Sequence, residues 1–117
     1  MAATIVRVAP EVPVRDLRQS IEYYEQKLGF EPVMELPDGE YAIVERDGIA
    51  IHLFQDAGHV SVGLHLFTGE LEELHQELVS RGAQVTQEIE RKPWGNRDFR
   101  VRDLSGNELK FTEGVDG

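Results

Sequence analysis

In the first part of the chain the spacing of apolar residues changes from every second residue, as in a strand, to every third or fourth residue, as in a helix. Residues 5–14 alternate and contain two prolines, which predicts a bent strand or an edge strand, because proline donates no hydrogen bond to a neighbouring strand. A helix begins after Asp16, which lies three residues before Gln19 as in a capping box, and ends before Gly29. Its apolar stripe is spaced by four, three and four residues and consists of Leu17, Ile21, Tyr24 and Leu28.

Three strands are predicted after this helix, over residues 30–36, 41–46 and 49–54. The turn residues Pro37-Asp38-Gly39 separate the first two strands, and Asp47-Gly48 between the second and third is a strong signal for a two-residue hairpin. The first half of the chain therefore predicts a strand, a helix and three strands.

The same order returns in the second half. Residues 60–67 alternate, a second helix runs from about Gly69 to Gly82, and further strands are predicted over 85–89, 99–102 and 108–112. We therefore predict an α+β fold and a single domain over residues 1–117, built of two βαβββ repeats at about 5–56 and 60–113. Neither repeat can close a core alone, so we expect their curved sheets to enclose a cleft for a small molecule.

Composition narrows the possible partners. The 117 residues contain 22 acidic and 12 basic side chains, a formal net charge of −10, and no cysteine. Disulfides and thiolate metal sites are excluded, and an acidic chain is poorly suited to bind nucleic acid or an anionic membrane surface. No apolar run approaches the roughly 18 residues of a membrane span, and the start of the chain does not have the pattern of a signal peptide. We therefore expect a cytoplasmic protein whose acidity is most simply explained by solubility.

Candidate chemistry is concentrated on histidine and aromatic residues. Neither a G-x-S-x-G elbow nor a phosphate-binding glycine loop occurs, whereas His52 and His65 fall on predicted strands and could face one cleft as metal ligands. His75 is better explained as a histidine at the edge of the core and His59 as a solvated loop residue.

Trp94, the one tryptophan, lies in the loop Lys92–Arg97, where it could stack on a flat or cationic ligand or could plug the end of a sheet. Tyr41 and Met34 leave the same two interpretations open, either as groups that contact a ligand or as part of the core.

Two groups of motifs resemble the vicinal oxygen chelate superfamily of glyoxalases, ring-cleaving dioxygenases and antibiotic resistance proteins. The opening strand and helix of that superfamily are similar to Val14-Arg15-Asp16-Leu17, Ser20-Ile21-Glu22-Tyr23-Tyr24 and Leu28-Gly29-Phe30. The end of the chain resembles the bleomycin resistance proteins, small acidic binding proteins, in Pro93-Trp94-Gly95, Arg97, Phe99, Arg102-Asp103, Gly106-Asn107 and Phe111.

The resemblance also implies where the superfamily's enzymes would hold a metal. The four ligand positions fall on Ala9, near His52, on Gly63 (or Ser61 or His65) and on Lys110. Alanine and glycine have no donor side chain and lysine brings a positive charge, so the resemblance points to a binding protein with no metal, no cofactor and no catalytic residue.

The same resemblance implies a function and a partner. Bleomycin resistance proteins sequester a cationic drug whose flat tail is held by aromatic side chains, in a groove formed by both subunits of a dimer. Applied to this chain, the resemblance implies that the ligand contacts Trp94, Tyr41 and Met34. The candidate site is completed by His52, Phe54 and His65. Pro10 resembles the hinge about which the N-terminal strand is exchanged between the two subunits.

Two alternatives remain from the sequence. One is a metal-dependent glyoxalase or dioxygenase with an atypical site on His52 and His65. The other is a relative that binds an unrelated metabolite or senses it for a partner, because one fold hosts many functions.

Overall fold

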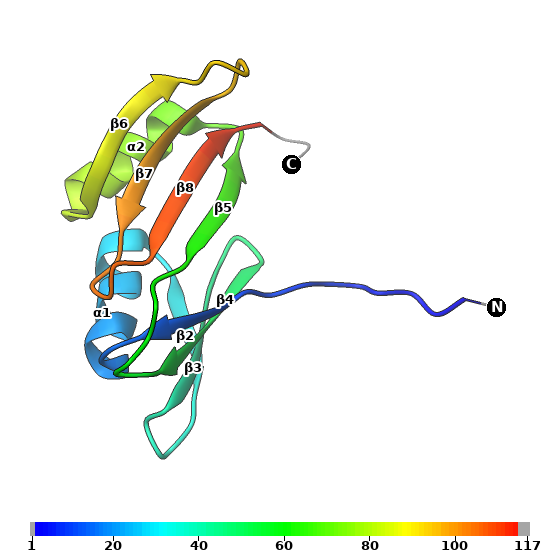
Figure 1. The fold of residues 1–117 in the computed structure, drawn as a ribbon, viewed down its shortest axis with the longest axis vertical. Helices are drawn as coiled ribbons and strands as arrows, with labels where there is room; N and C mark the ends of the chain where they lie inside the picture. Colours follow the sequence, from blue (N-terminus) through cyan, green and yellow to red (C-terminus); the bar gives the residue numbers. More distant parts are fainter. Residues whose placement is uncertain (1, 115–117) are drawn as a thin grey trace.

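The structure, a computed structural model, describes residues 2–114, which form two units of one helix and four strands each (Figure 1). The first unit contains β1 (Glu11–Val14), α1 (Leu17–Leu28), β2 (Glu31–Glu35), β3 (Tyr41–Arg46) and β4 (Ile49–Gln55). The second unit contains β5 (Gly63–Thr68), α2 (Leu71–Arg81), β6 (Gln84–Arg91), β7 (Arg97–Arg102) and β8 (Glu108–Glu113). The α+β class with two βαβββ repeats, predicted from the sequence, is confirmed.

Each unit forms its own mixed sheet. The strand order is β1-β4-β3-β2 in the first sheet and β5-β8-β7-β6 in the second. The strand before each helix pairs in parallel with the last strand of its unit, and the other neighbours are antiparallel. Each helix packs on one face of its own sheet, and the two helices also contact each other, which leaves the opposite face of each sheet uncovered.

The helices form for the local reasons that the sequence suggests. The side chain of Asp16 accepts a hydrogen bond from the Gln19 amide at 3.0 Å, and Gly29 ends α1 in the left-handed conformation at φ 75°. The predicted stripe of α1 is buried against the helix-facing side chains of the first sheet, namely Val12, Val14, Ala42, Val44, Ile51 and Leu53. None of the helices in the described part of the chain is long and apolar enough to cross a membrane.

A buried polar network joins the two units at the turn between β7 and β8. Asn107 donates to the Pro13 carbonyl at 2.8 Å and to Asp103 at 2.9 Å, and its carbonyl accepts from the Val62 amide at 2.9 Å. The Tyr24 hydroxyl donates to the other unit's Asp103 at 2.8 Å. Burial, reinforced by the Asp103 carboxylate, raises the pKa of Tyr24 well above its ordinary value.

Two predicted strands begin later than expected. Residues 5–10 lie outside the sheet and project away from the body of the molecule, with Ile5, Val6 and Val8 exposed at 92%, 90% and 90% (Figure 1). Regular pairing starts at Glu11, one residue after Pro10, which has no amide hydrogen to donate. In the second unit, residues 60–62 are a connection, because the Val62 amide donates to Asn107 and leaves β5 to begin at Gly63.

Candidate functional site

Four of the six predicted site residues share the uncovered face of the first sheet. Tyr41 lies opposite Phe54 across the β3–β4 pair, and Ile43 lies opposite His52 on β4 and Met34 on β2. Directly opposed residues point to the same side of a sheet, and their neighbours in sequence form the helix-facing core. We call this surface the first open face; it consists of Glu11, Pro13, Glu31, Met34, Tyr41, Ile43, Glu45, Ala50, His52 and Phe54.

A short chain of hydrogen bonds organises this face. The Tyr41 hydroxyl lies 2.9 Å from a carboxylate oxygen of Glu11 and 2.6 Å from Nδ1 of His52. A carboxylate only accepts hydrogen bonds, so Tyr41 donates to Glu11 and accepts from an Nδ1–H of His52. This tautomer leaves a lone pair on Nε2 of His52. Desolvation and then the Glu11 carboxylate raise the pKa of Tyr41, which keeps its hydroxyl protonated at neutral pH.

The uncovered face of the second sheet has the opposite electrostatic character. Its central row carries His65, Lys110 and Arg100, and the next row carries Phe67, Thr112 and Asp98. We call these residues, with Gln87, Glu90, Lys92, Arg102 and Glu108, the second open face. The first open face has three carboxylates and no lysine or arginine, whereas this face has three carboxylates and four lysine or arginine side chains.

Asp98 is the centre of the second open face. It is 4% exposed and accepts a hydrogen bond from the Gln87 amide at 2.6 Å, with Arg100 at 3.6 Å and Lys92 at 3.9 Å. Lys110, in contrast, makes no ion pair with any residue between 2 and 114. Arg102 on the same face also makes no ion pair with a residue in this range, so the face leaves two cations, Lys110 and Arg102, without an acidic partner.

His65 and Trp94, the other two predicted residues, occupy different places. His65 is hydrogen-bonded to Thr112 and stacks on Phe67 with ring centroids 4.6 Å apart. Trp94 lies in the β6–β7 turn and is 70% exposed, so it does not plug the sheet. That turn is at the opposite end of the molecule from the first sheet (Figure 1). Within one chain, Trp94 and Tyr41 are therefore not brought together.

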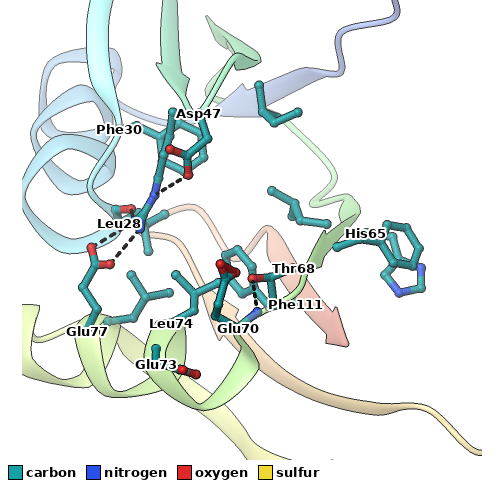
Figure 2. A pocket seen from close by; sticks show the side chains of 15 residues that line it. Leu28, Phe30, Asp47, His65, Thr68, Glu70, Glu73, Leu74, Glu77 and Phe111 are labelled. Atoms are coloured by element: carbon teal, nitrogen blue, oxygen red, sulfur yellow. Dashed lines mark hydrogen bonds and ion pairs between the residues drawn. The ribbon is translucent and has the colours of Figure 1, made fainter. Parts of the chain in front are cut away.

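A cavity between the two units lies at a place that the sequence did not indicate. A cavity of about 570 Å³ is formed where the two units meet, between the end of α1, the β3–β4 turn, β5 and α2 (Figure 2). Of the six predicted residues, His65 alone lines it, at its outer edge. Its lining residues come from separate elements and form no motif, so no signal in the sequence points to them.

The residues at the superfamily's metal positions do not fit a metal. Ala9 lies on the projecting N-terminal segment, Gly63 begins β5, and Lys110 brings a positive charge to the second open face. His52 and His65 lie on different sheets. Across residues 2–114, no group of three or more histidine or acidic side chains is arranged to hold a metal ion.

Comparisons with known proteins agree with this architecture. The family model described as the Glyoxalase/Bleomycin resistance protein/Dioxygenase superfamily matches residues 4–111. No curated protein matches the chain. The structure is similar to a bleomycin resistance determinant encoded on transposon Tn5, with TM-score 0.83, 22% identity and coverage of 94% of this chain and 98% of that one.

Two further solved structures show the range of proteins with this fold. TioX from Micromonospora sp. ML1 has TM-score 0.82 at 20% identity, over 94% of this chain and 99% of that one. A lactoylglutathione lyase from Agrobacterium tumefaciens has TM-score 0.78 at 19% identity, over 97% and 96%. These likenesses establish the fold, and the family match covers nearly the whole chain. The chain belongs to the glyoxalase/bleomycin resistance protein/dioxygenase superfamily.

Proposed function

We propose that this chain is a metal-free binding protein that sequesters a cationic, flat aromatic molecule, a bleomycin-type antibiotic, in the cytoplasm and so confers resistance. The first open face carries this proposal. It combines the aromatic rings of Tyr41 and Phe54 with the carboxylates of Glu11, Glu31 and Glu45, and it contains no lysine or arginine. Aromatic faces and nearby carboxylates together favour a flat guest with positive charge.

The proposed groove is formed by two copies of the chain. A guest that stacks on both Tyr41 and Trp94 needs a second copy, because Tyr41 begins β3 in the first sheet and Trp94 lies in the β6–β7 turn of the second sheet, at the opposite end of the molecule from the first sheet (Figure 1). Opposite charge on the two open faces favours their meeting across a two-fold axis. Residues 2–9 of one copy then extend away from it at Pro10 and pack on the partner copy. This contact covers the exposed side chains of Ile5, Val6 and Val8. A monomer at micromolar concentration in analytical ultracentrifugation would contradict this shared groove.

Fluorescence of Trp94 gives a direct assay, since it is the one tryptophan. Titration with copper-bleomycin should give a saturable change at micromolar drug. Tyr41→Leu keeps an apolar side chain but removes the ring, and should weaken binding by about 2- to 30-fold, equivalent to roughly 0.5–2 kcal/mol. Val79→Ala, an exposed change on α2, is the matched control and should leave the affinity unchanged. Absence of a saturable change refutes bleomycin as the guest.

The second candidate function is an enzyme of the superfamily with an atypical site. One observation favours it: the hydrogen bond to Tyr41 leaves Nε2 of His52 with a lone pair that can bind a metal or take a proton. Elemental analysis of protein purified without chelator separates the two candidates. Sub-stoichiometric metal, with no activity after addition of nickel, zinc, iron or manganese, eliminates the enzyme.

A further inference from the structure

The cavity at the junction of the two units is separate from both the proposed groove and its ligand. Its walls are the helix-facing side of the second sheet, the inner face of α2, the end of α1 and the β3–β4 turn (Figure 2). Its volume of about 570 Å³ lies within the range of small-molecule sites. It is complete within one chain, whereas the proposed groove needs two.

The floor of the cavity is apolar and well packed. Leu28, Phe30, Leu78 and Phe111 are buried, and Leu66 and Leu74 pack against them while still bordering the hollow. These side chains come from both units, so the floor exists because the units are held together. An apolar guest would gain contacts here without displacing any buried polar group.

One wall is fixed by a charged clamp. The guanidinium of Arg46 donates to the Leu28 carbonyl at 2.8 Å and to both oxygens of Glu77 at 2.9 and 2.7 Å. Arg81 donates to the same carboxylate at 2.7 Å. The clamp neutralises Glu77 and connects the first unit to α2, so the cavity is formed before any ligand arrives.

The rim of the cavity adds two carboxylates that form no ion pair within residues 2–114. Glu70 and Glu73 lie at the start of α2 and border the cavity, and neither forms an ion pair with a residue in the described part of the chain. Asp47 borders it from the β3–β4 turn, where its 3.4 Å contact with Arg46 is solvent-exposed. Apolar walls beside the unpaired carboxylates of Glu70 and Glu73 favour a guest with an apolar body and one positive charge.

We propose that this cavity is a second binding site, which takes a small lipophilic amine in its protonated form. The apolar body lies on Leu28, Leu74 and Phe111, and the ammonium group faces Glu70 and Glu73. Neither a second copy nor an aromatic guest is required, which distinguishes this site from the proposed groove.

Compact adamantane derivatives test the proposal because a rounded cage cannot stack between aromatic rings. We would titrate the full chain with 1-aminoadamantane, 1-adamantanol and 1-adamantanecarboxylate and follow amide shifts by ¹H–¹⁵N correlation spectroscopy. The amine should bind saturably, with the largest shifts at residues 66–74, and the carboxylate should bind about tenfold more weakly or not at all. Equal binding of the three compounds, or shifts centred on Tyr41 and His52, would overturn the site.

Two variants sharpen the test. Glu70→Gln combined with Glu73→Gln should reduce the preference for the amine over the carboxylate, whereas Glu31→Gln, an acidic change on the first open face, should not. The Glu70 and Glu73 variant should not alter the response to copper-bleomycin, whereas Glu31→Gln should weaken it, so failure of this site and failure of the proposed function are distinguishable.

The competing occupant is the N-terminal segment of another copy, whose Ile5 and Val8 are exposed and whose Arg7 is positively charged. Nuclear Overhauser contacts from these methyl groups to Leu74 or Phe111 in the free protein would show that the chain itself fills the cavity, and the proposal would then be wrong.

Discussion

Asn107→Ala tests the network that holds the two units together. The Asn107 side chain is fully buried at 0% exposure and makes its three hydrogen bonds to Pro13 in the first unit, Val62 in the connection and Asp103 in its own turn. Alanine cannot replace any of these bonds. The substitution therefore removes the one side chain that joins three segments which are distant in sequence.

The cost follows from what each partner loses. The Pro13 carbonyl becomes a buried acceptor without a donor, which costs about 1–3 kcal/mol. The Asp103 carboxylate loses a hydrogen bond from a neutral donor to a charged acceptor, about 1.5–3 kcal/mol, although it retains Tyr24. Val62 is part-exposed, so water can replace its lost acceptor at little cost. The free energy of unfolding should fall by roughly 2.5–6 kcal/mol, a large share of the 5–15 kcal/mol typical of a domain.

Urea unfolding followed by circular dichroism measures this change. Asn96→Ala, an exposed asparagine in the β6–β7 turn, is the control and should stay within about 0.5 kcal/mol of the parent. A lower slope with urea in the Asn107 variant would indicate that the units begin to unfold separately. A loss under about 1 kcal/mol with an unchanged slope would refute the reasoning, because water would then satisfy Pro13 and Asp103.

Two more predictions concern the charged clamp. Gly29→Ala and Gly39→Ala impose the same left-handed strain, at φ 75° and 73°, which costs each variant roughly 1–2 kcal/mol. A methyl group at Gly29 would also lie 2.6 Å from the Arg46 guanidinium, whereas Gly39 has open space around it. Thermal unfolding should therefore show a larger loss of stability for Gly29→Ala than for Gly39→Ala. The hydrogen bond from Arg46 lowers the pKa of Glu77, so this carboxylate contributes stability that is present above its unfolded pKa of about 4.3 and is lost as the pH falls through its lower folded pKa. Glu77→Gln should therefore be less stable at pH 7 but lose less stability between about pH 5 and 2, measured as urea midpoints at each pH.

Local signals were sufficient for the helices and hairpins. The N-cap at Asp16 and the helix end at Gly29 depend on hydrogen bonds within a few residues, and the Asp47-Gly48 turn fixes the β3–β4 pair by itself. The strand predicted over residues 5–14 is confirmed over Glu11–Val14 and is wrong over residues 5–10, because a strand also needs a partner. Parallel register places Glu11 opposite His52, and β4 begins at Ile49, so no residue of β4 remains to pair with residues 5–7.

The candidate site, too, could be predicted only where a local pattern determines it. Met34, Tyr41, His52 and Phe54 share one face because alternation along paired strands is a local property, and this face could be anticipated from the sequence. The cavity could not, since the contact between Arg46 and Glu77 joins residues that no periodicity relates. Motif resemblance was sufficient to place Trp94 on a turn. It could not show which other site residues lie near that side chain.

The charges behind the net charge of −10 are distributed unevenly over the structure. Among residues 2–114, acidic side chains without basic partners occur on the first open face and at the rim of the junction cavity, whereas the second open face carries two basic side chains without acidic partners, Lys110 and Arg102. Uniform acidity would serve solubility alone, and it would repel a second copy of the chain as much as it attracts a cationic guest. A segregated charge distribution is compatible with both the proposed dimer and the proposed guest. The unlike faces of two copies can approach each other, and the acidic surfaces still attract positive charge. In the proposed groove, guest and partner copy stabilise each other through linkage, because the guest stacks on Tyr41 of one copy and on Trp94 of the other.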